Sequence, residues 1–410
     1  MRITIALLTL GLLNIGCVAE ATESGTARSE SAIINGVNSG PEDDSAIALI
    51  NLPAGGTFSG ACSGVLISPR IVLTARHCVA ETEPGGIACT KEGMPVAGGG
   101  VVRDYPAKDL VVLTGASLDF AKLRTGPRAS KVIHTGTTNL CNNDIAIVLL
   151  DTPIKDAPIA PIRFNTAPEK GANILAVGWG VSNTSSEYKR RRRADIPIIA
   201  VGPASSSTGG GVGPNEFQIG EGICSGDSGG PAYDMTTKAV IGVVSRGGNG
   251  KFPAMGDPQY TGCVDKGTLV TKNLYTRTDT FKELILTAFA ETGEKPWLEG
   301  EPDPSKKPFG ETCAGPAECQ SNWCIGAGGK QFCSQICAPP DNACPAGYDC
   351  VDAGGTKLCA PAAAAKPAND TTPTTSKGGC STSPASESTG ILLFLGALGM
   401  IARRRSPARA

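Results

Sequence analysis

Short apolar runs separated by glycine, proline and asparagine occupy the chain from residue 33 to about residue 290. The runs are rich in β-branched side chains, which favours strands. The clearest of them are Val65–Ile67, Ile71–Thr74, Val111–Thr114, Ile145–Leu150, Ile174–Val177 and Val240–Ser245. Many short strands interrupted by turn residues predict an all-β sandwich or a pair of barrels.

The hydrophobic spacing changes at residues 279–289, at the end of this region. Phe281, Leu284, Ile285 and Ala288 follow the i, i+3, i+4, i+7 spacing of one buried helical face. We therefore predict a helix after the last strand.

Two more apolar stretches lie near the ends of the chain. Residues 3–15 are mostly apolar, follow Arg2 and precede the small-x-small sequence 19–21, so the pattern predicts export with a signal peptide at residues 1–21. The apolar run 391–402 is shorter than the ~20 residues that cross a bilayer as a helix, and three arginines follow it.

Composition limits the compartment and the classes of function. The 410 residues suggest two or three domains, and the net charge of −1 does not favour binding to nucleic acid or anionic lipid. Sixteen cysteines with 5% aromatic residues point to an oxidising compartment and to disulfides. We therefore expect a secreted protein.

A dense cysteine cluster follows the β-rich region. After a proline-rich, charged linker at residues 294–312, eight cysteines fall within residues 313–360, which predicts a small disulfide-rich module. Their connectivity stays open, because eight cysteines allow about 105 pairings. Zinc is the competing interpretation, disfavoured by the wide spacings, the absence of histidine and the export signal. Residues 361–379 form a stalk rich in Ala, Pro and Thr.

The candidate chemistry lies in the sequence Cys224-Ser225-Gly226-Asp227-Ser228-Gly229-Gly230-Pro231, where a serine stands in a glycine-rich turn. A serine hydroxyl is a weak nucleophile until a base removes its proton and a partner orients that base. Of the two histidines, His77 lies between Arg76 and Cys78, whereas His134 has no motif around it and is interpreted as a loop or strand residue. Asp144 lies in the sequence between His77 and Ser228, so the order of the three residues is His, Asp, Ser.

These motifs and three others occur in the order found in the trypsin-like serine proteases of the chymotrypsin fold, and residues 33–290 resemble that family. The others are Ile33-Ile34-Asn35-Gly36, as at a mature N-terminus, Cys62–Ile67, as in the strand before the histidine, and Gly178-Trp179-Gly180. The resemblance implies a mainly β domain at residues 33–293, built as two six-stranded antiparallel β-barrels with a C-terminal helix.

The resemblance also implies the role of each site residue. His77 would take the proton from Ser228, Asp144 would orient the imidazole, and the N–H groups of Gly226 and Ser228 would form the oxyanion hole. Each residue taken alone is more often structural, whereas three in the family's order and flanking sequences predict a catalytic triad.

Activation in the family pairs a new N-terminal ammonium with the aspartate before the nucleophile, so the resemblance makes Ile33 and Asp227 the activation pair. Residues 22–32 would be the pro-segment. Because Ala32 precedes Ile33, a trypsin-like cut at that bond is not expected. Cleavage after Arg28 followed by trimming, and cleavage by a different protease, are both open alternatives.

The resemblance places the substrate pocket at Gly222, Ser245, Arg246, Gly247 and Asn273. Gly222 stands where trypsins carry an aspartate, so no strong preference for Arg or Lys is expected, although the neighbouring Glu221 is a candidate substitute. Arg246 replaces the usual tryptophan, and Asn273 stands where a glycine often lines the pocket and would narrow it. We predict a preference for small or medium uncharged side chains.

The same resemblance implies the disulfides Cys62–Cys78, beside the histidine, and Cys224–Cys263, beside the nucleophile. Cys89 and Cys141 are then the remaining pair of this region. No metal site and no cofactor are expected.

The most charged run of the chain is Lys189–Arg193. It is interpreted as a self-cleavage loop, as a patch for an anionic partner, or as a solvated loop that enters the strand Ile196–Val201, and the solvated loop is preferred.

The C-terminal residues 380–410 resemble the surface-sorting signals of myxobacterial proteins, in which a cysteine, here Cys380, precedes a spacer, a short apolar tail and arginines. A plain tail anchor with cytoplasmic arginines is the alternative. The sequence before Cys17 resembles a lipoprotein signal, but Asn14 stands at an aliphatic position, so simple signal-peptide cleavage is preferred. Lipidation is open at both cysteines.

The leading hypothesis is a secreted serine endopeptidase, displayed on the outer surface of a bacterial cell, that hydrolyses peptide bonds through an acyl-enzyme. It is expected to be a monomer that binds a peptide or protein substrate, binds no nucleic acid and touches a membrane only through its terminal segments, while the module binds an unknown surface partner. A catalytically weak or inactive binding protein on a protease scaffold is the alternative, and the intact motifs argue against it. A structural adhesion protein leaves the triad unexplained.

Overall fold

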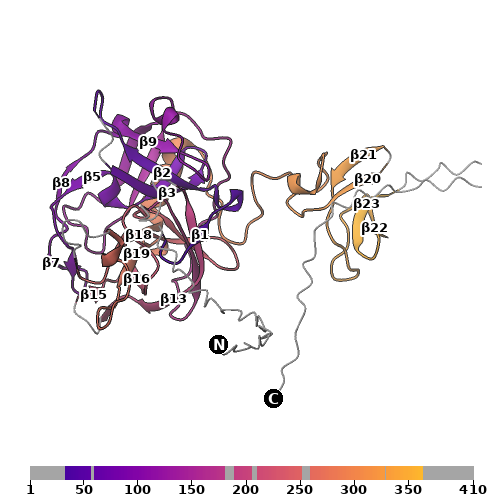
Figure 1. Ribbon diagram of the computed structural model, residues 1–410. Coiled ribbons are helices and arrows are strands. Elements are labelled where there is room, and N and C mark those ends of the chain that lie inside the picture. The colour runs from indigo at the N-terminus through magenta and orange to yellow at the C-terminus, as the bar shows by residue number, and fades with distance from the viewer. Residues whose placement is uncertain are drawn as a thin grey trace, which may run out of the picture.

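The computed structural model describes residues 33–56, 60–180, 189–205, 210–251, 259–327 and 329–362. The predicted signal peptide, pro-segment and terminal sorting signal, with Cys17 and Cys380, lie outside the described residues, as does the stalk beyond residue 362. Figure 1 shows a larger β-rich unit followed along the chain by a smaller disulfide-rich unit. Among the described residues, no helix is long and apolar enough to cross a membrane.

The first half of the β-rich unit is a six-stranded antiparallel sheet. In spatial order its strands are β10 (Ala129–His134), β11 (Ala146–Leu150), β4 (Ile71–Thr74), β3 (Gly60–Ser68), β2 (Ala46–Asn51) and β9 (Leu110–Leu113). Strands β2, β4, β9 and β11 are buried along their whole length. This burial explains why the sequence shows continuous apolar runs there rather than strict alternation.

The second half is a seven-stranded sheet. In spatial order its strands are β1 (Val37–Asn38), β13 (Arg191–Val201), β12 (Asn173–Gly178), β17 (Pro231–Asp234), β18 (Val240–Arg246), β19 (Asn273–Arg277) and β16 (Glu216–Ile219). Because β13 also pairs with β16, the six strands other than β1 close into a barrel.

The expected pair of six-stranded barrels is therefore one closed barrel and one half-barrel. The edge strands β9 and β10 of the first sheet approach each other through an isolated bridge between Val111 and Arg128. Next to it, the Val112 N–H donates to the carbonyl of Pro127 at 2.9 Å. Proline has no N–H with which to continue a ladder, so the pairing stops at this point.

The predicted helix is confirmed as α1 (Lys282–Thr292), which follows the 3₁₀ turn η6 (Asp279–Phe281). Ile285 and Ala288 are fully buried and belong to the main core. Gly293 ends the helix with a φ of +70°, a left-handed conformation that glycine adopts without steric cost.

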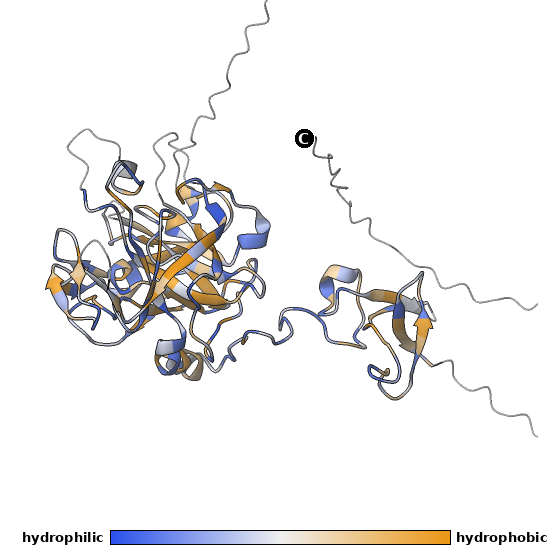
Figure 2. Cartoon of the chain, turned by 90° about the horizontal axis from the view of Figure 1, so that it is seen from below, coloured by the Kyte–Doolittle hydropathy of each residue, from blue (hydrophilic) through white to orange (hydrophobic). Residues whose placement is uncertain are grey.

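The main core lies between the two sheets and against α1. It combines Leu73 and Ile147 of the first sheet with Val177 and Val243 of the second and with Ile285 of α1, all fully buried. Figure 2 shows apolar residues concentrated in the strands inside this unit and polar residues mostly in its loops. This packing fixes the two sheets relative to each other, and the candidate site forms where their loops meet.

Shorter elements complete the β-rich unit. The additional strand pairs are β5 (Ala80–Thr82) with β8 (Val101–Asp104), β6 (Ala88–Cys89) with β7 (Pro95–Ala97), and β14 (Ala204–Ser205) with β15 (Gly211–Val212). The 3₁₀ helices are η1 (Pro41–Asp43), η2 (Arg76–Cys78), η3 (Ala107–Asp109), η4 (Phe120–Arg124) and η5 (Gln259–Gly262).

The disulfide-rich unit holds two hairpins after a 3₁₀ turn, η7 (Pro316–Glu318). The hairpins are β20 (Cys324–Ala327) with β21 (Lys330–Cys333), and β22 (Tyr348–Asp352) with β23 (Lys357–Pro361). Its bridges are Cys313–Cys324, Cys319–Cys333, Cys337–Cys350 and Cys344–Cys359. In each half the first cysteine pairs with the third and the second with the fourth, so the unit is a tandem repeat. Because all eight sulfurs are in disulfides, the zinc interpretation does not apply.

The predicted linker at residues 294–312 is hydrogen-bonded near both ends. The Ile162 N–H donates to Trp297 O at 2.9 Å, which holds the first part against the β-rich unit. The Lys307 N–H donates to Glu318 O at 2.7 Å, which holds the last part against the disulfide-rich unit. The connection between the two units is therefore shorter than the sequence indicated.

Candidate active site

His77, which is partly exposed, and the fully buried Asp144 form a hydrogen-bonded pair. His77 lies on η2, directly after β4, and the Cys62–Cys78 disulfide ties η2 to β3. Asp144 precedes β11, which pairs with β4, so adjacent strands bring the two side chains together. His77 Nδ1 lies 2.8 Å from Asp144 Oδ2, and the His77 backbone N–H donates to Oδ1 at 3.0 Å.

The surroundings of Asp144 keep it ionised despite complete burial. Burial alone raises the pKa of its carboxyl, but the charge and hydrogen bonds of His77 and the hydroxyl of Ser245, at 2.7 Å, hold that pKa below its usual value. Burial lowers the pKa of the His77 imidazole, and the Asp144 carboxylate raises it by more. The pair therefore stabilises an imidazolium, the form that a histidine base takes after it accepts a proton.

The turn that carries Ser228 is anchored beside His77 by its main chain. Ser63 of β3 donates its N–H to Ser228 O at 2.7 Å and its hydroxyl to Gly226 O at 2.9 Å. Cys78 Sγ, from the residue after His77, lies 3.5 Å from Ser228 O. Gly226 has a φ of +94°, which a side chain would disfavour. The fold thus brings the three predicted triad residues into one region, with Ser228 half-buried.

Ile33 and Asp227 are also brought together, as a buried pair. Both are fully buried, and the Ile33 N–H donates to Asp227 Oδ2 at 3.1 Å. The N–H groups of Cys224 and Gly180 donate to the two carboxylate oxygens at 2.9 and 2.8 Å. Burial raises the pKa of Asp227 to about 6 in spite of these bonds. In the intact sequence Ile33 follows Ala32 and carries an amide, so no cation compensates this carboxylate at that nitrogen.

The three disulfides of this region are Cys62–Cys78, Cys89–Cys141 and Cys224–Cys263, the pairs that the sequence analysis named. The first and third lie directly beside His77 and the Ser228 turn. They fix the two segments whose relative position the candidate chemistry depends on.

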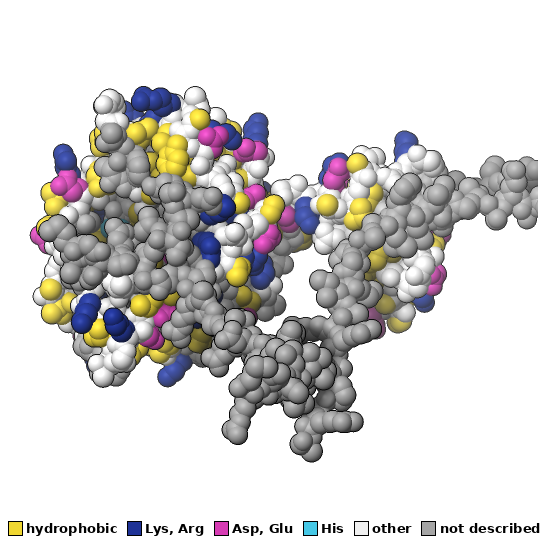
Figure 3. All heavy atoms as spheres, in the orientation of Figure 1, with side chains coloured by type: hydrophobic (Ala, Val, Ile, Leu, Met, Phe, Trp, Pro, Cys, Tyr) yellow, Lys and Arg dark blue, Asp and Glu magenta, His cyan; other side chains and the backbone are white. Residues whose placement is uncertain are grey.

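The arginine run is packed against the segment 34–46 that follows Ile33, and the preferred interpretation as a solvated loop is wrong. Arg190 is fully buried. It donates to Ser39 Oγ, the Asp44 carboxylate and the carbonyls of Gly40, Ala46 and Gly115. The next three arginines bind Gly36, Asn38, Glu42, Asp43 and Ile34. The run therefore holds the N-terminal segment in place. Figure 3 shows Lys and Arg side chains interspersed with Asp and Glu on the described surface of one face.

Asn273 closes one side of the predicted pocket. It is 1% exposed and lies on β19. Its Oδ1 accepts the Gly248 N–H at 3.1 Å, and its Nδ2 donates to Gly220 O at 2.8 Å. The side chain therefore links the segments that carry Gly248 and Gly220, beside the predicted pocket residues Gly247 and Gly222.

Gly222 is buried, and the neighbouring carboxylate does not replace the charge that trypsins carry there. Glu221 accepts hydrogen bonds from Asn35 Nδ2 at 2.5 Å and from the Asp265 N–H at 2.9 Å. These partners hold the Glu221 carboxylate toward the N-terminal segment and Asp265. The carboxylate therefore does not take the place of the aspartate that trypsins carry at the position of Gly222.

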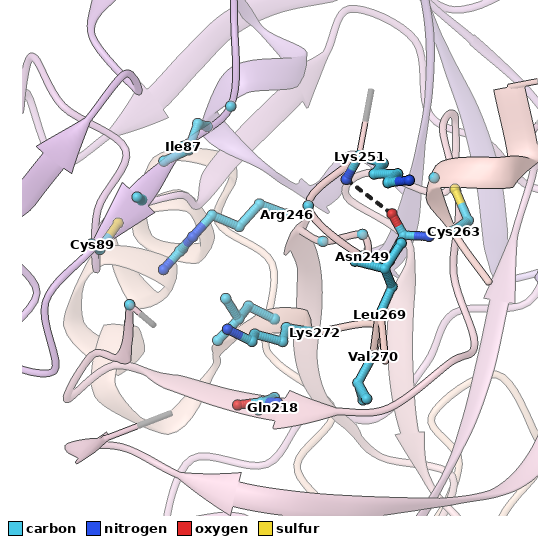
Figure 4. A pocket seen from close by; sticks show the side chains of 18 of the residues that line it. Ile87, Cys89, Gln218, Arg246, Asn249, Lys251, Cys263, Leu269, Val270 and Lys272 are labelled. Carbon is cyan, nitrogen blue, oxygen red and sulfur yellow. Dashed lines mark hydrogen bonds between the residues drawn. The ribbon is translucent and has the colours of Figure 1, made fainter. Parts of the chain in front are cut away.

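A cavity of about 750 Å³ runs beside this pocket (Figure 4). Arg246 and Gly247, which the sequence placed along the substrate, line it together with Ser225. Its other walls include residues that the sequence analysis missed, namely Ile87, Lys251, Leu269, Val270 and Lys272. They come from loops without a motif, so no local signal identified them.

Comparisons with known proteins find a matching family and several relatives. The family described as Trypsin matches residues 33–257. A curated protein named Trypsin from Saccharopolyspora erythraea is 25% identical over 227 residues, covering 52% of this chain and 86% of that protein. Trypsin alpha-4 from Lucilia cuprina is 27% identical over 207 residues, covering 48% and 71%. The solved structure of scabies mite inactivated protease paralogue S-I1 has a TM-score of 0.42 at 19% identity, covering 62% of this chain and 99% of that one.

Proposed function

Because this chain belongs to the trypsin family, we propose that it is a serine endopeptidase that cleaves peptide bonds with the triad His77, Asp144 and Ser228. The observation that carries the proposal is the hydrogen-bonded His77–Asp144 pair beside the anchored Ser228 turn. Its relatives include proteins named trypsin, which agrees with a serine protease.

In the proposed mechanism Ser228 Oγ attacks the scissile carbonyl carbon while His77 Nε2 accepts the hydroxyl proton. The C–N bond then breaks as His77 gives that proton to the leaving amine, and water hydrolyses the acyl-enzyme by the same route. The 2.8 Å contact with Asp144 keeps the proton on Nδ1 and leaves Nε2 as the base. The N–H groups of Gly226 and Ser228 are assigned to the oxyanion, in the turn that the positive φ of Gly226 permits.

A fluorophosphonate that reacts with activated serines tests this assignment. We expect the full chain, processed to begin at Ile33, to be labelled on Ser228, as located by peptide mass spectrometry. Its cleavage of a diverse peptide mixture should fall in proportion to the labelling, and the urea-unfolded chain should take no label. A folded, processed chain that neither takes the label nor cuts would contradict the proposal and favour a binding protein.

We propose that the pocket selects small or medium uncharged side chains, because Asn273 links the segments that carry Gly248 and Gly220. Replacing Asn273 by glycine is expected to raise kcat/KM for peptides with Phe or Tyr before the cut about tenfold relative to Ala. The matched control is Asn273→Asp, which keeps the size and should instead favour Arg and Lys. Cleavage profiles of the three proteins on one peptide library give the comparison. An equal gain for large and small side chains in Asn273→Gly would show that Asn273 does not set the pocket size.

We also propose that the protein works outside the cell, attached to the bacterial surface through the terminal segments. The seven disulfides of the described residues require an oxidising compartment, which supports secretion. Mass spectrometry of the mature protein locates its first and last residues and any lipid on Cys17 or Cys380. A mature cell-surface form that still carries the arginine tail would favour the plain tail anchor.

A further inference from the structure

Glu216 and Arg246 form a buried ion pair behind the candidate site. Glu216 begins β16 and is fully buried, and the Arg246 side chain at the end of β18 is 9% exposed. Arg246 Nη1 and Nη2 donate to the two oxygens of Glu216 at 2.5 and 2.9 Å, a bidentate geometry. Arg246 was expected to line the substrate pocket. It lines the cavity, but its guanidinium is also bound to Glu216.

The same carboxylate holds the loop that carries Asp144. Glu216 accepts the Asn142 N–H at 3.2 Å and the Gly213 N–H at 2.8 Å. Asn142 has a φ of +63°, and Asn215 binds its side chain and its carbonyl at 2.6 and 3.0 Å. Glu216 thus fixes the backbone two residues before Asp144 in a left-handed conformation that asparagine tolerates.

The guanidinium is separated from the triad aspartate by one hydroxyl. Arg246 Nη1 lies 3.4 Å from Ser245 Oγ, which donates to Asp144 Oδ2 at 2.7 Å. An unpaired cation at this place would interact electrostatically with Asp144 and His77 across a buried region, where solvent screens charges poorly. The Glu216 carboxylate neutralises it.

We propose that Glu216 and Arg246 are positioning residues of the site: Glu216 holds the Asn142–Asp144 loop in place, and the pair keeps the buried charge next to Asp144 neutral. This rests on the proposed function, because it assigns the pair to the same triad.

The proposal predicts opposite electrostatic effects for two nearly isosteric changes. Glu216→Gln leaves an uncompensated cation, which should lower the pKa of His77, whereas Arg246→Gln leaves an anion, still bound by Asn142 and Gly213, and should raise it. The expected shifts are on the order of one pH unit each. The double variant Glu216→Gln/Arg246→Gln, without either charge, should return the titration close to that of the parent protein.

The titration is measured on the full chain with His134→Gln, so that His77 is the single histidine. NMR follows its imidazole in a Ser228→Ala background, and the acid limb of kcat/KM follows it in the active chain. Asp144 and the Arg76–Asp104 pair also lie near His77 and are not substituted in any variant. His134→Gln removes the 3.2 Å contact of His134 Nε2 with Asp104, and it does so equally in every protein compared. Because NMR needs no turnover, loss of proteolysis and loss of the charge coupling are separate results.

Shifts of opposite sign that cancel in the double variant would support the proposal. If the charge-removing variants Glu216→Gln and Arg246→Gln lose kcat but leave the His77 titration in place, the proposal is overturned, because a merely structural pair would behave in that way. Arg246→Lys keeps the charge without the bidentate bond, so we expect an unchanged titration and a kcat lower by on the order of tenfold. If Arg246→Gln fails to fold, Glu216→Gln and the double variant still show whether the pKa of His77 shifts in the expected direction and returns when both charges are removed.

Discussion

Replacing Asp144 by asparagine is expected to lower kcat about 10⁴-fold with little change in KM. Asp144 accepts three hydrogen bonds, from the His77 N–H, from His77 Nδ1 and from the Ser245 hydroxyl. An amide offers one acceptor oxygen, so its NH₂ group would face at least one of these donors. The imidazole would then carry its proton on Nε2 and lose its ability to accept one from Ser228.

The measurement is steady-state cleavage of the best peptide from the library, with two reference variants. Ser228→Ala sets the floor, at a loss of roughly 10⁶-fold. Asp151→Asn, an exposed aspartate outside the site, is expected to keep full activity. Near-normal activity in folded Asp144→Asn would remove Asp144 from the proposed triad.

The candidate site was predictable from the sequence because its residues lie in contiguous motifs. Turns such as the one around Ser228 need specific neighbours, including a glycine at 226, so the local sequence carries the signal. The strands were predictable for a similar reason, since buried β-branched runs are local features. The helix near residue 285 followed from its spacing alone.

The behaviour of the arginine run was not predictable, because it depends on partners far away in the sequence. Arg190 is buried by contacts with residues around Asp44, almost 150 positions earlier. A run of like charges is usually solvated, and no local pattern shows that backbone carbonyls surround this one. The same holds for Arg246, whose partner Glu216 lies on another strand.

The incomplete closure of the first sheet and the disulfide pairing of the module also depend on non-local geometry. Pro127 lies just before β10, and only the observed register shows that it falls where the half-barrel would close. The crossed disulfides of the module, such as Cys313–Cys324 with Cys319–Cys333, are one of many pairings that the spacing allows.

The second large effect concerns the N-terminus: a free amine at Ile33 is expected to stabilise the fold by about 3 kcal/mol at pH 7 and by less than about 1 kcal/mol at pH 4. Burial raises the pKa of Asp227 from its ordinary value of 3.8 to about 6. Well below pH 3.8 the carboxyl is protonated in both the folded and the unfolded chain, so it has no effect on stability there. As the pH rises from 4 through 6, the unfolded chain ionises first and the stability of the unprocessed fold falls.

Thermal unfolding of Ser228→Ala, which cannot digest itself, measures this effect. The full-length chain is compared with a chain that begins at Ile33, between pH 4 and pH 8. At pH 7 the processed chain should melt roughly 6–12 °C higher, because the Ile33 ammonium replaces an amide as the partner of a charged carboxylate. A chain that begins at Ile34 is the matched control and should gain nothing.

The pH dependence separates this explanation from a simple gain in packing. Ile33 is buried in the uncleaved chain, so its apolar contacts exist before processing and would contribute equally at both pH values. Asp227→Asn removes the titrating group, and the difference between its two forms should no longer change between pH 4 and pH 7. A difference that stays constant with pH in the Asp227 protein would mean that processing acts through the removed segment rather than through the ion pair. Cleavage of the Ala32–Ile33 bond would then only release the N-terminal segment, and the Ser228 turn would already be ordered before that cleavage.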